Sequence, residues 1–209
     1  MAAALSPEAA AGMVAVSRET LERLRAYVDL LRKWRARINL VGASTLADPW
    51  RRHILDSAQL HPLLPDGARV VVDLGSGAGF PGLVLAAMGV PEVHLIEADA
   101  RKCAFMREAA RIMGVPATIH NRRIEAVTPF AADAVTARAL APLAVLLGHA
   151  EPFLGGGGQC LFLKGRGGED ELTEAAKDWT MAAETIRSLS DPLGNILRIG
   201  EVKRGRAAR

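Results

Sequence analysis

The stretch "VVDLGSGAGFPG" at residues 71–82 contains two overlapping glycine patterns that can hold a nucleotide. Starting at Gly75 it is G-x-G-x-G, and starting at Gly77 it is G-x-G-x-x-G, the formal dinucleotide-binding pattern. The apolar run "RVVVDL" leads directly into Gly75, so the dinucleotide pattern starts two residues too late. A dinucleotide fingerprint starting at Gly75 would need its third glycine at Phe80. The sequence therefore disfavours a dinucleotide; a tight turn without any ligand is the other alternative.

Two carboxylates beside this turn indicate which cofactor it binds. Asp73 ends the first predicted strand, and Glu97 ends the next one, 22 residues after Gly75. A carboxylate at Asp73 would repel a pyrophosphate, whereas it suits a ligand that carries an ammonium and a sulfonium group, as S-adenosyl-L-methionine does. Glu97 can accept hydrogen bonds from both ribose hydroxyls, which fits NAD equally well. We therefore predict that Asp73, Gly75, Ser76, Gly77 and Glu97 bind S-adenosyl-L-methionine.

Strands and helices alternate from Arg69 onward, which predicts right-handed βαβ units and a parallel sheet. A Gly155–Gly158 turn is expected before the strand "QCLFLKG", and the tail "TIRSLSDPLGNILRIGEVKR" predicts a closing antiparallel pair. The predicted strands are "RVVVDL", "EVHLIEA", "ATIHNR", "DAVTARA" and "QCLFLKG", and the predicted helices are "PGLVLAAMG", "ARKCAFMREAARIMG" and "PLAVLLGHAEPFL".

The N-terminal part is predicted to be helical. Ser17 is a candidate N-cap for a helix with an apolar stripe at threes and fours, and a second helix is expected from Asp48-Pro49 to about His61. We predict two parts, an N-terminal helical extension over 1–64 and one compact domain over 65–209.

The composition favours a cytoplasmic protein with a single core. Half of the 209 residues are hydrophobic, but no apolar run is long enough for a membrane span, and no basic region precedes the Ala-rich start. Cys103 and Cys160 lack metal-ligand or disulfide spacing, so we expect buried free thiols and no metal site. Residues 18–52 carry nine Lys/Arg against four Asp/Glu, and "KRGRAAR" ends the chain. Two basic ends fit a polyanion partner, although solvated surfaces would look the same.

Six motifs along the chain belong together: "INLVG", "RRHILDS", "VVDLGSGAGFPG", "NRRIEAV", "TARALAPL" and "LFLKGR". With these motifs the chain resembles the bacterial small-subunit ribosomal RNA guanine-N7 methyltransferases, once called glucose-inhibited division protein B. The resemblance extends from about Leu30 to Lys203, and "FPG" and "RHILDS" are its most specific marks. It implies an α/β, class I S-adenosylmethionine-dependent methyltransferase (Rossmann-like) sheet and 16S ribosomal RNA or the small ribosomal subunit as partner.

The resemblance also implies further cofactor contacts. Besides Gly75, the family's contacts fall on Phe80, Ile124, Glu125 and Arg138. Arg138 lies between apolar residues in "AVTARAL", so it needs a polar partner if it is buried. Glu97 stands where relatives often have aspartate.

Methylation at guanine N7 uses a lone pair without a proton, so the enzyme needs alignment and no general base. Positioning of this kind can remove roughly 7–11 kcal/mol from a barrier. We predict that Arg123, Arg138 and Lys164, which follow or end strands beside the cofactor, position the substrate through its phosphates or O6 edge.

His53, Asp56 and Ser57 share one predicted helix and superficially suggest a catalytic triad. No G-x-S-x-G elbow is present, so a helix that packs over the cofactor mouth is favoured.

Three other functions remain open. Ribose 2′-O methylation would use Lys164 as the base, a small-molecule methyltransferase would use the N-terminal helices as a lid, and a non-catalytic module would only bind RNA. We expect a monomer without membrane contact; the target nucleotide and the form of RNA substrate are not specified by the sequence.

Overall fold

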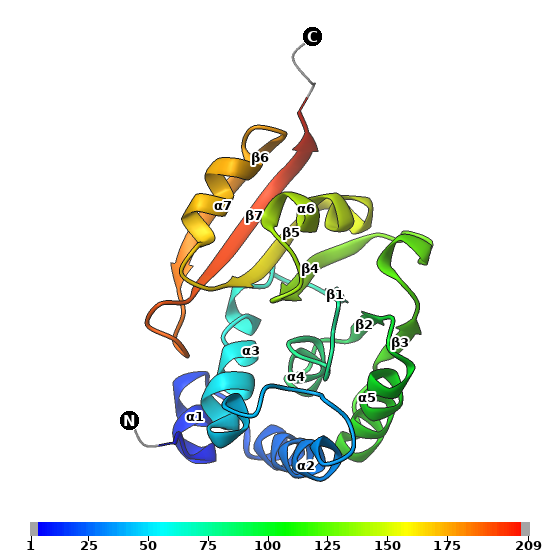
Figure 1. Ribbon diagram of the computed structural model, residues 1–209, viewed down its shortest axis with the longest axis vertical. Coiled ribbons are helices and arrows are strands. Elements are labelled where there is room, and N and C mark those ends of the chain that lie inside the picture. The colour runs from blue at the N-terminus through cyan, green and yellow to red at the C-terminus, as the bar shows by residue number, and fades with distance from the viewer. Residues whose placement is uncertain (1–3, 206–209) are drawn as a thin grey trace.

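The computed structural model describes residues 4–205 as a three-layer arrangement around one seven-stranded sheet (Figure 1). The strand order is β3-β2-β1-β4-β5-β7-β6; β1 to β5 are parallel, and β7 is antiparallel to both β5 and β6. The predicted parallel sheet with a closing antiparallel pair is confirmed. The strands are β1 (Val70–Leu74), β2 (Glu92–Glu97), β3 (Thr118–Asn121), β4 (Ala132–Arg138), β5 (Leu154–Lys164), β6 (Trp179–Arg187) and β7 (Asn195–Arg204).

The helices cover the two faces of the sheet in two groups (Figure 1). One apolar cluster joins α2, α4 and α5 to alternate strand residues such as Val71 and Leu95, and a second joins α6 and α7 to residues such as Val72 and Phe162. This alternation follows from the two-residue period of a strand. The helices are α1 (Pro7–Met13), α2 (Arg18–Arg35), α3 (Asp56–Ala58), α4 (Gly82–Ala87), α5 (Ala100–Met113), α6 (Leu143–Ala150) and α7 (Gly168–Ala175).

The N-terminal helices form largely as predicted. The Ser17 side chain accepts a hydrogen bond from the Thr20 amide and caps α2. The second predicted helix begins as a π-helical turn, Trp50–Leu55, continues into α3, and is followed by a 3₁₀ turn at His61–Leu63. The division between residues 64 and 65 stays a prediction. Within residues 4–205, no helix combines the length and apolar character of a membrane span.

The prediction of a turn at Gly155–Gly158 is wrong, because these glycines lie within β5. The pairing between β4 and β5 is irregular there, and Gly157 has a φ of +86°. A Cβ at Gly158 would lie 2.7 Å from the Ala132 carbonyl oxygen. The glycines therefore permit a bulged strand rather than a reversal of the chain.

A buried carboxylate joins β1 to its neighbours at the start of α4. Asp73 is fully buried; its Oδ1 accepts a hydrogen bond from the Thr136 hydroxyl on β4 at 2.9 Å, and its Oδ2 accepts one from the Gly82 amide at 3.3 Å. A Cβ at Gly82 would overlap the Leu95 side chain and lie 3.0 Å from the Asp73 Cβ. Close packing and a buried hydrogen bond therefore both fix where α4 begins.

Replacement of Gly82 by alanine should destabilise the protein by about 1–3 kcal/mol, because the added methyl group has no room. Gly12→Ala is the matched control on exposed α1, where no atom lies within 4 Å of the added Cβ. It should leave stability unchanged or raise it by about 1 kcal/mol. Denaturant unfolding measures both, and equal effects would contradict the steric explanation.

Stability should also depend on pH through Asp73. Burial raises the pKa of this carboxyl group to about 6, so the folded protein holds the proton more tightly than the unfolded chain. Relative to Asp73→Asn, the wild type should therefore lose about 3 kcal/mol of unfolding free energy as pH rises from about 3 to about 7. Unfolding free energies of both proteins across this range test this. A constant difference between them would show that Asp73 titrates normally.

Candidate active site

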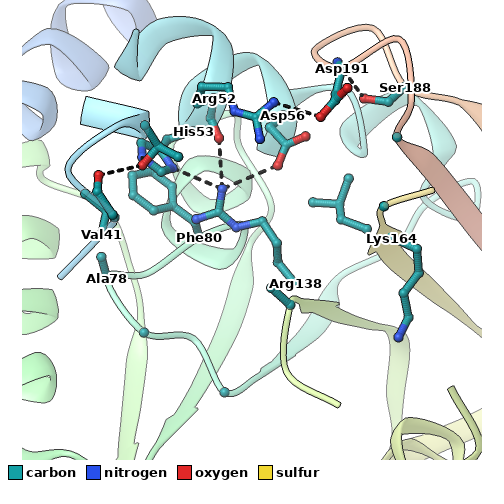
Figure 2. Close-up of a pocket in the computed structure, with 18 of the residues that line it drawn as sticks. Val41, Arg52, His53, Asp56, Ala78, Phe80, Arg138, Lys164, Ser188 and Asp191 are labelled. Atoms are coloured by element: carbon teal, nitrogen blue, oxygen red, sulfur yellow. Dashed lines mark hydrogen bonds and ion pairs between the residues drawn. The ribbon is translucent and has the colours of Figure 1, made fainter. Parts of the chain in front are cut away.

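A cavity of about 360 Å³ opens at the carboxyl ends of the parallel strands. Its walls come from the glycine turn, the segments around Val41 and His53, the ends of β4 and β5, and the loop between β6 and β7 (Figure 2). In open α/β sheets this edge is where ligands bind. The cavity is therefore the candidate active site.

The glycine turn begins where β1 ends. Gly75, Gly77 and Gly79 have φ values of +63°, +59° and +92°, a conformation that side chains other than glycine rarely adopt. The turn starts at Gly75, immediately after Leu74, which is the register that the sequence favoured. Gly75, Ser76 and Gly77 line the cavity together with Phe80. The structure thus brings four of the predicted cofactor residues to one wall.

The two predicted carboxylates support this turn from outside the cavity. Asp73 lies beneath it, fully buried, and does not line the cavity. Glu97 ends β2 and accepts hydrogen bonds from the amides of Gly77 and Asp99, at 2.9 and 2.8 Å. The geometry does not support a direct contact of Asp73 with a cofactor; both carboxylates act on the backbone that shapes the site.

Phe80 is packed between side chains from three elements. The His53 ring stacks on it at a centroid distance of 4.9 Å, Tyr27 lies 5.0 Å away, and the Arg138 Cζ lies 5.0 Å from the ring centroid. Phe80 is 3% exposed. It therefore forms a rigid wall whose position also fixes that of Arg138.

Arg138 ends β4 and has the polar partners that a largely buried arginine needs. Its Nη1 donates to the Arg52 carbonyl at 3.0 Å, to the His53 Nδ1 at 3.1 Å and to the Asp56 Oδ2 at 3.3 Å (Figure 2). Burial and the nearby charges of Arg138 and Arg52 lower the pKa of His53 to about 3. His53 is therefore neutral, so its Nδ1 accepts from Arg138 and its Nε2 donates to Thr45 Oγ1, at 3.0 Å.

The arrangement of His53, Asp56 and Ser57 is not a catalytic triad. The Ser57 hydroxyl is buried and donates to the His53 carbonyl at 2.7 Å, within the helix. His53 and Asp56 both contact Arg138. The sequence predicts that this helix packs over the cofactor mouth, and its residues His53 and Asp56 do line the cavity. Their support of Arg138 is a finding of the structure.

Lys164 ends β5 at the cavity, but its ammonium group points away from it (Figure 2). Nζ donates to the Ala141 carbonyl and to Glu171 Oε2, both at 2.7 Å, and the side chain is 8% exposed. Glu171 lies on α7, which the sequence analysis did not predict. The geometry therefore favours a structural role for Lys164 over contact with the substrate.

Arg123, Ile124 and Glu125 follow β3 and do not line the cavity. Arg123 and Glu125 are exposed, and Ile124 packs against the apolar cluster beside α6. The Glu125 Oε1 lies 3.7 Å from the His149 Nε2. Their contact with the cofactor or substrate stays a prediction.

Sequence reasoning missed the wall provided by the loop between β6 and β7. Ser188 and Asp191 line the cavity from this loop, and the Arg52 Nη1 donates to the Asp191 Oδ2 at 2.8 Å (Figure 2). The two partners are 139 positions apart in the chain. No local spacing could have signalled this pair.

Solved structures share the fold at low sequence identity. The ribosomal protein L11 methylase of Lactobacillus delbrueckii subsp. bulgaricus matches with a TM-score of 0.59 and 16% identity, over 73% of this chain and 78% of that one. A TehB-like SAM-dependent methyltransferase of Corynebacterium glutamicum matches with a TM-score of 0.58 and 16% identity, over 86% and 100%. The fold is thus that of class I S-adenosylmethionine-dependent methyltransferases.

Curated relatives are far more similar in sequence. The ribosomal RNA small subunit methyltransferase G of Paramagnetospirillum magneticum is 63% identical over 203 residues, which cover 97% of this chain and 99% of that protein. The protein of the same name from Rhodospirillum rubrum is 62% identical, over 96% and 100%. The profile of the GidB family, described as rRNA small subunit methyltransferase G, matches residues 20–194. This chain therefore belongs to the rRNA small subunit methyltransferase G family, whose members use S-adenosyl-L-methionine.

Proposed function

We propose that this protein methylates N7 of a guanine in 16S ribosomal RNA, with S-adenosyl-L-methionine as methyl donor. The observation that carries the proposal is the match to relatives named for the small-subunit ribosomal RNA over nearly the whole chain. This substrate favours a cytoplasmic location, and we expect the protein to act as a monomer.

The cavity supports a reaction that depends on alignment. S-adenosyl-L-methionine supplies an activated methyl group on its sulfonium. Each cavity residue that could take a proton already has a partner. His53 is neutral with both ring nitrogens hydrogen bonded, and Lys164 is bound to Glu171. The carboxylates Asp56 and Asp191 are paired with arginines. Attack by the N7 lone pair requires no such group. The protein's contribution is then to hold the reactants at attack distance.

We propose that the turn residues Gly75, Ser76 and Gly77, with Phe80, hold the cofactor directly. Glu97 would fix the turn through its hydrogen bond to the Gly77 amide, and the ribose contact expected of it stays a prediction. The glycines leave room for a ligand to approach the backbone closely.

Two arginines at the cavity have carboxylate partners that offset their charge. Arg138 is paired with Asp56 at 3.3 Å, and Arg52 with Asp191 at 2.8 Å. Because each has a carboxylate partner, they do not present two uncompensated charges to a cationic cofactor. We propose that Arg138 positions the substrate base or phosphate and transfers no proton. The geometry gives less support to binding of a substrate phosphate by Lys164, because its ammonium group is engaged elsewhere. Binding of a phosphate by Arg123 stays a prediction.

The geometry gives less support to the other methyl acceptors. Ribose 2′-O methylation needs a base, and the Lys164 ammonium is engaged by Glu171 and the Ala141 carbonyl. A small neutral acceptor would bind independently of salt, whereas polyanion binding weakens steeply as salt rises.

The first test is transfer of a labelled methyl group to small-subunit RNA and particles from a strain that lacks this gene. We expect one labelled guanine, and chemical cleavage specific for N7-methylguanine should locate it. RNA binding should weaken steeply with salt. A product at a ribose or an exocyclic amine would refute the N7 assignment, and absence of transfer to any RNA would refute the proposed activity.

Arg138→Ala should lower the rate of methyl transfer at saturating substrates by about 100-fold, because displacement of a positioning group by about 1 Å can cost that much. Cofactor affinity should change little. Arg111→Ala, which removes an exposed arginine paired with Glu108 on α5, is the control and should leave the rate unchanged. A normal rate for Arg138→Ala would exclude its positioning role. A normal rate together with weaker RNA binding would show that Arg138 serves only to bind RNA.

A further inference from the structure

Asp56 lies between Arg138 and the loop that joins β6 to β7. Its side chain is 18% exposed, and its two oxygens have different partners. Oδ2 accepts from Arg138, while Oδ1 accepts from the Ser190 hydroxyl and from the Gln59 Nε2 at 3.4 Å. One carboxylate therefore connects the end of β4 with a loop far away in sequence.

The same helical segment binds this loop at two further positions. The Gln59 Nε2 donates to the Ser188 Oγ at 3.0 Å, its Oε1 accepts from the Leu189 amide at 2.6 Å, and Arg52 pairs with Asp191. Arg52, Asp56 and Gln59 are four and three positions apart, so they lie on one side of the segment. The loop is thus attached to the face that contacts Arg138.

Asp56 differs from the other two groups that accept from Arg138 in carrying a charge. The Arg52 carbonyl is neutral, and so is His53, because its pKa is lowered to about 3. The Arg138 side chain is 20% exposed and lies over Phe80. A guanidinium in such a site needs a carboxylate partner to stay out of water. Without Asp56, it would turn toward solvent and leave its place over Phe80.

We propose that Asp56 is a positioning residue for methyl transfer: it holds the Arg138 guanidinium over Phe80, and the loop residue Ser190 holds Asp56. This inference rests on the proposed function and adds a route by which the loop between β6 and β7 affects the reaction. Asp56 lines the cavity, and in this proposal it acts through Arg138.

A double-mutant cycle on the full-length protein tests this route. The rate of methyl transfer is measured in single turnovers at saturating cofactor and RNA for the wild type, Asp56→Ala, Arg138→Ala and the double variant. Asp56→Ala should lower this rate by about 10- to 100-fold in the wild type, but by less than about 3-fold when Arg138 is already alanine. The dissociation constants of cofactor and RNA should change by less than about 2-fold.

Two results would overturn the proposal. Equal effects of Asp56→Ala with and without Arg138 would mean that Asp56 acts independently, and a normal rate for Asp56→Ala would mean that Arg138 does not need it. If the wild type itself transfers no methyl group to RNA, the proposed function fails instead, so the two failures are distinguishable.

Milder variants protect the test against misfolding. Asp56→Asn removes the charge and keeps one acceptor oxygen, and Ser190→Ala removes the hydrogen bond from the loop. Both should slow transfer with Arg138 present and have little effect in the Arg138→Ala background; additive effects would contradict the proposal. The Glu108–Arg111 pair on α5 provides the control cycle, and Glu108→Gln should leave transfer unchanged with or without Arg111→Ala.

Discussion

The site depends on one buried carboxylate at the junction of β1, β4 and α4. Asp73 accepts from the Thr136 hydroxyl and the Gly82 amide and so ties the end of one strand to its neighbour and to the next helix. Its burial is unfavourable for the charged form, as its raised pKa shows. In exchange, the hydrogen bonds of Asp73 fix the chain before and after the glycine turn, whose residues Gly75 and Gly77 line the cavity.

A second constraint comes from charge. The arginines at the cavity carry carboxylate partners, and the network from Arg138 through Asp56 to Ser190 connects three parts of the chain. Hydrogen bonds in partly buried networks strengthen one another and make the loss of any member costly. This arrangement gives the cavity a defined shape, which the proposed reaction by alignment requires. Such a site is suited to aligning two reactants whose own chemistry supplies the reactivity.

The sequence was informative where local rules decide the structure. The register of the glycine turn follows from the strand that precedes Gly75, and the order of strands and helices follows from alternating apolar patterns. It was less informative where a partner lies far along the chain. The sequence predicts that Asp73 faces the cofactor. It could not reveal the position of Asp73 beneath the turn, because that position depends on Thr136, 63 residues away. The sequence also predicts that Lys164 contacts the substrate. It could not reveal the ion pair with Glu171, because Glu171 lies on α7, whose sequence "GEDELTEA" has few apolar residues to indicate a helix.

The strand order has a consequence for how the enzyme is made. β6 pairs with β7 alone among the described strands, and β7 separates it from β5, although β6 precedes β7 in the chain. During synthesis, β6 therefore emerges before the strand that connects it to the sheet exists. The loop that carries Ser188 and Asp191 lies between these two strands and contacts the helical segment of Asp56. A chain whose synthesis has not reached β7 would thus lack the strand that joins this part of the cavity wall to the sheet.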